Sequence, residues 1–168
     1  MGYFYFDESI HTRGGFIIGA FVYSQEDLTD DVFRALREFG LVPTQDEFKS
    51  HRIMNKDSRW QALRDRLKAL LQRTKVGLVV LPINSRGYLG SEALIGLEKI
   101  LLANFTGSEK HCVYFDEGIR FEKCESIERS LEERHNCTVF VEQDSRVIGG
   151  FNLQTLQRIV CQSCCWRL

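Results

Sequence analysis

The sequence predicts one α/β domain built on a mixed sheet, with an N-terminal antiparallel hairpin followed by alternating helices and strands. Strand-forming residues fill 2–8 and 14–23, and turn residues separate these segments, as in a β-hairpin. Beyond the hairpin, segments with helical periodicity alternate with short apolar segments, which is typical of a sheet with helices on both faces. The chain has 168 residues, of which 43% are hydrophobic, and this is enough to bury one substantial core.

Local signals predict the helices and strands that follow the hairpin. Apolar residues recur at helical spacing over residues 28–39 and again from Trp60 to Leu71, where Asp57 or Ser58 is expected to cap the helix. Residues 76–83 form a continuous apolar run, which predicts a buried strand. The remaining predictions are a helix capped by Ser91 that extends to Leu102, a strand over 112–115, a charged helix over 121–134 and a strand over 138–141.

Composition and charge limit the classes of function. Lys and Arg number 22 and Asp and Glu number 23, so the net charge is −1 and no global positive field indicates a nucleic-acid-binding protein. No segment looks able to span a membrane, and the start lacks the pattern of a secretory signal, so we expect a cytoplasmic protein. The six cysteines are then expected as free thiols, and the CxxC at Cys161 and Cys164 has no second pair to complete a zinc site.

Carboxylates follow three of the predicted strands. Asp7 and Glu8 end the first strand, Asp116 and Glu117 follow another, and Asp144 follows the last. Sites in α/β sheets form beyond the carboxyl ends of the strands, so Asp7, Asp116 and Asp144 would converge if their strands are neighbours. Converging carboxylates repel one another unless a cation bridges them, which predicts a divalent metal site. The alternative is that each carboxylate suits the turn after its own strand.

Other polar residues could contribute to such a site. Glu47 and Lys49 are two residues apart, so on one face of a strand Glu47 could bind a metal and Lys49 could contact a phosphate. The alternative for this pair is an ordinary exposed position. His11 and His51 could carry protons or be ordinary loop histidines. Ser9 has no His or Asp partner at a readable spacing, and we interpret it as a turn residue.

These motifs resemble a bacterial and phage family of RNase-H-like domains, the domain-of-unknown-function family numbered 3800. Members begin with a strand that runs into Asp-Glu-Ser-Gly, matched here by Asp7, Glu8 and Ser9, with Ile10 in place of the glycine. The later elements of the family are matched, in order, by a glycine-containing strand over 15–22, the Glu-x-Lys element at 47–49, the strand that ends at Asp116, and Asp144-Ser145. The resemblance covers residues 1–150.

The resemblance implies an RNase-H-like domain over residues 1–150 and a metal-dependent nuclease. The implied catalytic residues are Asp7, Glu8, Glu47, Lys49, Asp116 and Asp144. Of these, the three aspartates would hold Mg²⁺ or Mn²⁺, the glutamates would add ligands or orient water, and the lysine would steady a phosphate. One departure is that the strand over 76–83 carries no carboxylate, although such enzymes often place one on the strand beside the first.

The family pattern ends at Gly150. Members continue into a helix that contains a further Asp, whereas residues 151–168 have a different sequence that ends in Cys164-Cys165-Trp166. When the permitted codons are regrouped from the third base of the Gly150 codon, they allow Ile-Gln-Ser-Ala-Asp-Leu-Ala-Ala-His, which resembles the helix of the family. We therefore predict that a frameshift, natural or a sequencing error, turned residues 151–168 into an atypical tail.

Two functions are consistent with these observations. The first is hydrolysis of phosphodiester bonds in DNA or RNA, impaired if the altered tail removes a metal ligand. The second is an inactive RNase-H-like module that binds nucleic acid or a protein partner. That alternative is motivated by basic residues of one predicted helix, although a solvated helix face explains them too: Arg59, Arg64, Arg66, Lys68 and Arg73. The sequence leaves the oligomeric state open, and apolar surface exposed by truncation could favour self-association.

Overall fold

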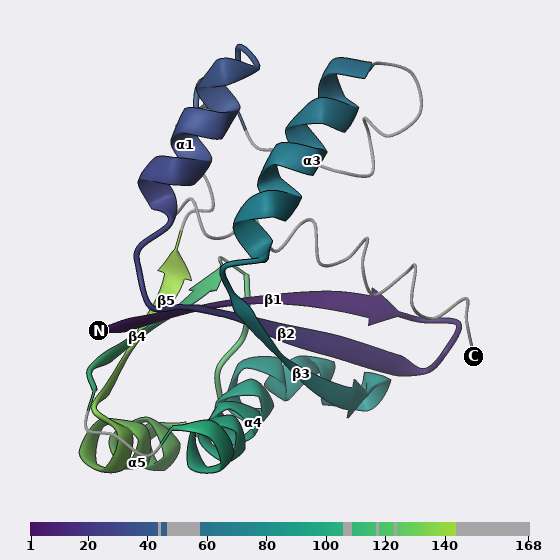
Figure 1. Cartoon of the computed structure of the whole chain (residues 1–168). Helices are drawn as coiled ribbons and strands as arrows, with labels where there is room; N and C mark the ends of the chain where they lie inside the picture. Colours follow the sequence, from purple (N-terminus) through teal and green to yellow (C-terminus); the bar gives the residue numbers. More distant parts are fainter. Residues whose placement is uncertain (44, 47–57, 106–108, 117, 123, 144–168) are drawn as a thin grey trace.

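The computed structural model describes residues 1–43, 45–46, 58–105, 109–116, 118–122 and 124–143. A long hairpin opens the chain, and helices and strands then alternate (Figure 1). The elements in chain order are β1 (Gly2–His11), β2 (Phe16–Ser24), α1 (Thr29–Glu38), α3 (Ser58–Leu71), β3 (Lys75–Pro82), the 3-10 helix η1 (Ile83–Tyr88), α4 (Leu89–Asn104), β4 (His111–Asp116), α5 (Glu125–His135) and β5 (Cys137–Gln143).

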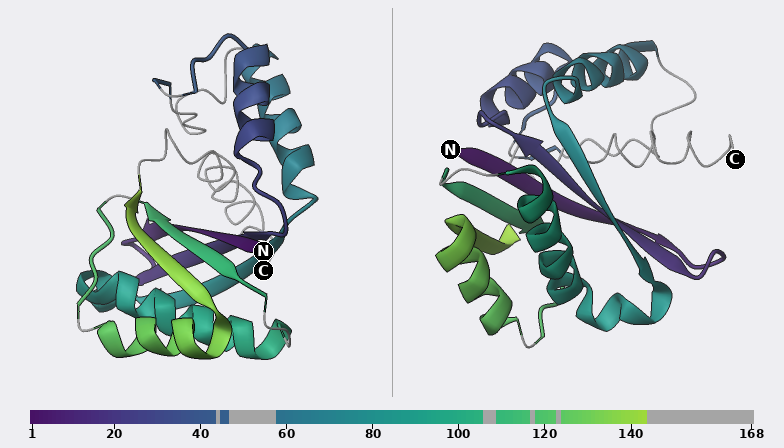
Figure 2. Two further views of the ribbon diagram at one scale, coloured as in Figure 1. Left: turned by 90° about the vertical axis from the view of Figure 1, so that its left-hand side faces the viewer. Right: turned by 60° about the horizontal axis from the view of Figure 1, so that its bottom comes forward.

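The strands form one five-stranded sheet in the order β3-β2-β1-β4-β5. β1 pairs antiparallel with β2, and β2 pairs antiparallel with β3, whereas β4 is parallel to β1 and β5 is parallel to β4. α4 and α5 cover one face of the sheet, and α1 and α3 lie on the other side (Figure 1, Figure 2). The mixed five-stranded sheet with helices on both sides confirms the predicted α/β fold class.

The main core lies between the sheet and the layer formed by α4 and α5. Alternate residues of the central strands point to this face, and Phe4, Phe6 and Phe115 are each at most 1% exposed. Leu94 and Leu97 of α4 fill the opposite side of this core and are fully buried. Because the interior is closely packed, the strands that lead to the candidate site have a rigid support.

Small residues bring α4 close to the edge of the sheet. A Cβ atom at Gly96 of α4 would lie 2.5 Å from a methyl group of Val79, and one at Gly77 of β3 would lie 2.6 Å from Ile100. Both distances are shorter than real carbon contacts. A larger residue at Gly96 would push the helix and the strand apart, whereas one at Gly77 would require the end of the Ile100 side chain to move aside. The middle of α4 thereby lies close against β3.

α1 and α3 pack as a pair and form a second core. Leu36 of α1 and Leu63 of α3 are fully buried in the contact between the two helices. Leu71 at the end of α3 joins Tyr5 and Val22 on the sheet, so the pair covers only the beginning of β1 on that face. In the part of the chain that the structure describes, no helix combines the length and the apolar character needed to cross a bilayer.

The structure corrects the prediction that residues 76–83 form a buried strand. The run is a strand, but β3 lies at the edge of the sheet, and Val76, Leu78 and Val80 are 51%, 52% and 67% exposed. The alternate residues face α4, where Leu81 is 9% exposed. A continuous apolar run predicts burial on both faces, and the sequence does not show that α1 and α3 end before they reach this part of the sheet.

The predicted N-cap at Ser91 is wrong as well. α4 begins at Leu89, so Ser91 is inside the first turn of the helix. Its hydroxyl donates to the carbonyl oxygen of Glu122 at 2.6 Å and accepts from the amide of Glu122 at 3.0 Å, so it links α4 to the segment before α5. The hairpin and the other predicted helices and strands are present, with ends shifted by a few residues.

Candidate functional site

The carboxyl ends of three parallel strands meet at one edge of the sheet. β1, β4 and β5 are neighbours in that order, and both pairings are parallel. Residues at the ends of these strands are therefore brought to the same edge, which is where α/β sheets place binding sites. The strands that carry Asp7 and Asp116 are thus neighbours, whereas Asp144, which follows β5, lies outside the described residues.

Asp7 and Asp116 share one face of the sheet. Phe6 is the register partner of Phe115, so these two aspartates are the next residues on the two strands. Side chains alternate along a strand and the two phenylalanines point into the main core, so the aspartates point to the opposite face. Both are half-buried, and the backbone amide of Glu8 donates to Asp7 Oδ1 at 2.8 Å. Two carboxylates in this arrangement repel each other, and a cation between them relieves the repulsion.

A stack of aromatic rings precedes the two aspartates on the same face. The rings of Tyr5 and Tyr114 stack with centroids 5.5 Å apart, and Tyr114 stacks in turn on Phe140 of β5 at 5.0 Å. Tyr5 is 1% exposed, and burial raises the pKa of Tyr114 to about 12, so its hydroxyl stays neutral at ordinary pH. Such a surface of low polarity strengthens the electrostatic interactions of the carboxylates beside it.

A β-bulge lies beside Asp116. Between the pairs Tyr114–Phe140 and Asp116–Gln143, β4 advances by two residues and β5 by three, so the extra residue is on β5. Bulges are common next to active sites, because they bend the strand and redirect the residues that follow. The irregularity therefore falls at the edge where the three parallel strands end.

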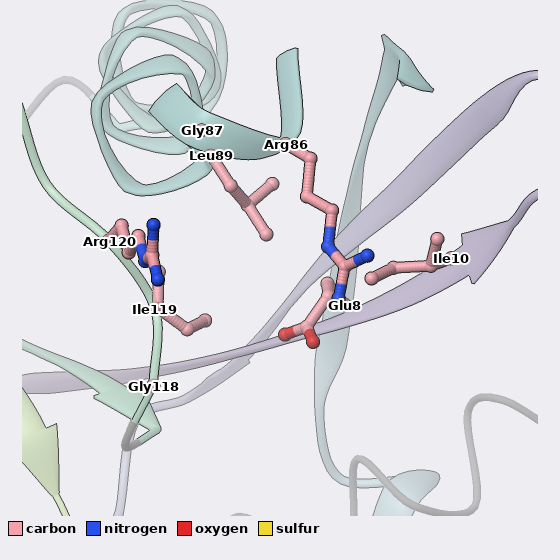
Figure 3. Close-up of a pocket in the computed structure, with 8 residues that line it drawn as sticks. All are labelled: Glu8, Ile10, Arg86, Gly87, Leu89, Gly118, Ile119 and Arg120. Carbon is pink, nitrogen blue, oxygen red and sulfur yellow. The ribbon is translucent and has the colours of Figure 1, made fainter. Parts of the chain in front are cut away.

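Glu8 lies on the other face of the sheet, away from the two aspartates. The alternation of β1 directs Glu8 to the side of the main core, although it follows Asp7 directly in the sequence. It lines a cavity of about 400 Å³ there, and its carboxylate points into the cavity (Figure 3). The side chains that line this cavity with it are Ile10, Arg86, Leu89, Ile119 and Arg120. The structure thus does not bring Glu8 together with Asp7 and Asp116 on one face.

Other residues predicted for the site have different outcomes. Glu47, Lys49 and His51 lie outside the described residues, as does the predicted tail over 151–168. Ser9 is not a turn residue, because β1 continues to His11. The hydroxyl of Ser9 lies 3.2 Å from Nε2 of His11, two residues on along the same face of the strand, and the imidazole stacks on Phe16.

Acidic residues neutralise much of the basic face predicted for α3. Arg64 is buried, and Arg73, just after the helix, hydrogen-bonds to Asp31 and Glu26, which raise the pKa of its guanidinium. Two further ion pairs on this helix join Arg66 to Glu38 at 3.7 Å and Lys68 to Asp65 at 3.8 Å. This face of α3 is therefore a weak candidate for binding a nucleic acid.

The sequence analysis missed two arginines at the same edge of the sheet. Arg86 follows β3 and Arg120 follows β4, and both strands run parallel to β1 and end at this edge. Neither arginine belongs to a motif. The signal that could have found them is their position just after a strand, which is the same signal that predicts the aspartates.

The aspartate pair fits a divalent metal ion. Carboxylate oxygens are the ligands that Mg²⁺ prefers, and this ion keeps several waters and uses one or two protein carboxylates. Within the described residues, no group of three or more His, Cys, Asp and Glu side chains forms a metal site, so a fuller ligand set would need residues outside them. Cys112, Cys124 and Cys137 are free thiols, as predicted.

Comparisons with known proteins do not assign a family. No protein-family model matches the chain, and no curated protein matches it. Among solved structures, this chain is similar to a protein chain in the structure of the PCNA:RNase HII complex from Archaeoglobus fulgidus. The two chains are 13% identical and superpose with a TM-score of 0.47, and the similarity covers 95% of this chain and 72% of that chain. The fold class therefore rests on the sheet topology, and no function is transferred from this similarity.

Proposed function

We propose that the chain is a metal-dependent nuclease of RNase-H-like type, which hydrolyses phosphodiester bonds in DNA or RNA in the cytoplasm, and that it belongs to the domain-of-unknown-function family numbered 3800. One observation carries the proposal: Asp7 and Asp116 lie side by side on neighbouring parallel strands, at the edge of the sheet where sites form. The aspartate that opens the family motif is one member of this pair.

In this proposal, Asp7 and Asp116 hold Mg²⁺ or Mn²⁺, and Asp144 completes the ligand set. A bound divalent ion activates water and stabilises the charge that develops on the phosphate. The chain supplies two carboxylates on rigid strands, with Asp7 oriented by the amide of Glu8 and the aromatic stack excluding water beside them. Glu47 and Lys49 stay in the proposal as a further ligand and a phosphate contact.

A nuclease assay tests the proposal. The purified chain is incubated with labelled single-stranded and double-stranded DNA and RNA, once with Mn²⁺ and once with EDTA. We expect cleavage in the reaction that contains Mn²⁺ and none in the reaction that contains EDTA. We expect Asp7→Asn to reduce the rate of cleavage at least about a hundredfold, because this change removes a charged metal ligand. The matched control is Asp30→Asn, which removes the same charge from an exposed position in the first turn of α1 and should leave the rate unchanged.

Two results would contradict the proposal. Full activity of Asp7→Asn would remove this residue from the site, and cleavage in EDTA would remove the metal. If the wild-type chain cleaves none of the substrates, the alternative is the inactive binding module. The ion pairs on α3 weaken that alternative, because they leave less free positive charge on the face that motivated it.

A further inference from the structure

The cavity around Glu8 is built from three segments that converge at the carboxyl edge of the sheet. β1 contributes Glu8 and Ile10, the 3-10 helix η1 contributes Arg86, and the segment after β4 contributes Arg120 (Figure 3). Its volume of about 400 Å³ is in the range of sites that bind small molecules. The cavity lies on the opposite face from Asp7 and Asp116, next to them along β1.

The wall that carries Arg120 is held in place by hydrogen bonds. The amide of Gly90 at the start of α4 donates to the carbonyl oxygen of Arg120 at 3.0 Å. Ser91 makes two hydrogen bonds with the backbone of Glu122, one as donor and one as acceptor. Ile119 is 8% exposed and packs in the main core, so the backbone on both sides of Arg120 is fixed. A side chain on such a support is oriented before any ligand arrives.

Glycines keep the mouth of the cavity open. Gly118 has a φ of +86°, a left-handed conformation that other residues rarely adopt, and it lets the chain turn directly after β4. A Cβ atom at Gly87 or Gly118 would meet nothing within 4 Å, so the space in front of both is empty. A ligand can therefore approach the backbone closely between Arg86 and Arg120.

The two arginines of the cavity differ from Arg73 in their ion pairing. Neither Arg86 nor Arg120 forms an ion pair within the described residues, whereas Arg73 is held by Asp31 and Glu26. Both are exposed at the cavity. A guanidinium presents paired N–H donors that match the oxygens of a phosphate, so two unpaired arginines at one cavity favour a phosphate ligand.

Glu8 restricts what that ligand can be. Its carboxylate points into the same cavity, where it would repel a free phosphate ion (Figure 3). The same carboxylate would accept a hydrogen bond from a hydroxyl or amino group close to the phosphate. A nucleotide unit of a polynucleotide combines these groups, since its phosphate is followed by sugar and base.

We propose that this cavity binds one nucleotide unit of a nucleic-acid strand, with Arg86 and Arg120 on its phosphate and Glu8 accepting from a sugar or base group. The inference deepens the proposed function, because it shares the assumption of a nucleic-acid substrate. The strand would pass over the edge of the sheet from this cavity to the aspartate pair. Recognition and hydrolysis would then use opposite faces of β1.

Binding in the absence of metal tests this inference separately from cleavage. Fluorescence anisotropy measures the affinity of short labelled single-stranded RNA and DNA in EDTA, for the wild type, Arg86→Gln, Arg120→Gln and the double variant. Each single change should weaken binding about tenfold, because it removes charge-assisted hydrogen bonds to phosphate. The slope of log affinity against log salt should fall by about 0.7 for each arginine removed. The control Arg129→Gln removes an exposed charge of α5 outside the cavity, and should change affinity less than about twofold.

The outcomes separate the two proposals. Weaker binding by the two cavity variants, but not by Arg129→Gln, supports the cavity even if no substrate is cleaved. The RNA and DNA arms show which strand supplies the nucleotide. The inference would be overturned if Arg86→Gln and Arg120→Gln bound with the same affinity as Arg129→Gln. This result would overturn it even if the wild-type protein cleaves nucleic acid. No binding by the wild type would overturn it as well.

Discussion

The two faces of the sheet differ in how completely the described helices cover them. Under α4 and α5, Phe6 and Phe115 are fully buried in the main core. On the other face, α1 and α3 cover the beginning of β1, and Val80 of β3 remains 67% exposed. Asp7 and Asp116 are on this less covered face, where a carboxylate can meet water, metal or substrate. The covered face stabilises the fold, and the open face carries the proposed chemistry.

This difference between the faces shows that the register of β1 must satisfy both of them: one set of its side chains packs in the core, and the other carries Asp7. Phe6 packs in the main core, the next residue, Asp7, belongs to the aspartate pair, and Glu8 lines the cavity that also contains Arg86 and Arg120. A slip of one residue would bury Asp7 in the main core and expose Phe6, which is costly because an isolated buried carboxylate lacks solvation. Stability of the covered face therefore positions the residues of the open face.

The largest expected effect is on stability, from paired substitutions on the two faces. Phe6→Ala should lower the free energy of unfolding by roughly 3–5 kcal/mol, because it leaves a cavity among packed rings. Val80→Ala should change it by about 0.5 kcal/mol or less, because the valine is mostly exposed. Urea unfolding monitored by circular dichroism measures both. Equal losses would contradict the contrast between the faces.

A smaller effect is expected from His111, which is 2% exposed on the face under α4 and α5. Burial lowers the pKa of His111 below its usual value, and the amino terminus and His135 act in the same direction against Glu109. The unfolded chain takes up a proton near pH 6.5 and the folded chain resists it, so this part of the stability is present above that pH. It is lost as the pH falls through the lower folded pKa.

His111→Asn sharpens this test, because it removes the titrating group. Unfolding free energies measured between pH 5 and pH 8 should fall toward low pH in the wild type, and the fall should be shallower in the variant. The absolute stability of the variant is not the readout, since a buried substitution lowers it at every pH. An identical slope in both proteins would show that His111 is not held neutral by burial.

The smallest effect on stability is expected from Arg73→Gln, just after α3. The guanidinium joins Asp31 and Glu26, which raise its pKa, but the arginine and Glu26 are exposed and Asp31 is only partly buried. Exposed ion pairs contribute little and are screened by salt. The melting temperature should fall slightly at low salt, and the difference should vanish in 1 M NaCl. A large loss that persists in high salt would mean that this pair supports the fold.

The sequence predicts the order of elements well, because periodicity and turn residues are local signals. The hairpin, the helix over 28–39 and the strands that carry Asp7 and Asp116 all follow from such patterns, whereas the parallel pairing of these two strands does not. Exposure of β3 does not follow from them, since the coverage of an apolar strand depends on where distant helices end. The error at Ser91 has the same origin, because its partner Glu122 is distant in the sequence.

The candidate site is predicted in part. Placement after strands identified Asp7 and Asp116, and the sheet order brings them together. The motif groups Asp7 with Glu8, but the period of a strand separates them onto opposite faces. Arg86 and Arg120 were missed because they become neighbours only through the sheet, and no spacing in the sequence relates them.

The most direct test of the central claim is Mn²⁺-dependent thermal stabilisation. The melting temperature is measured in EDTA and over a Mn²⁺ titration, for the wild type, Asp116→Asn and the control Asp30→Asn. A site that binds only the folded chain stabilises it by ligand linkage, so we predict that Mn²⁺ raises the melting temperature of the wild type and the control, and not that of Asp116→Asn. Equal stabilisation of Asp116→Asn and the wild type, or none in either, would contradict the account.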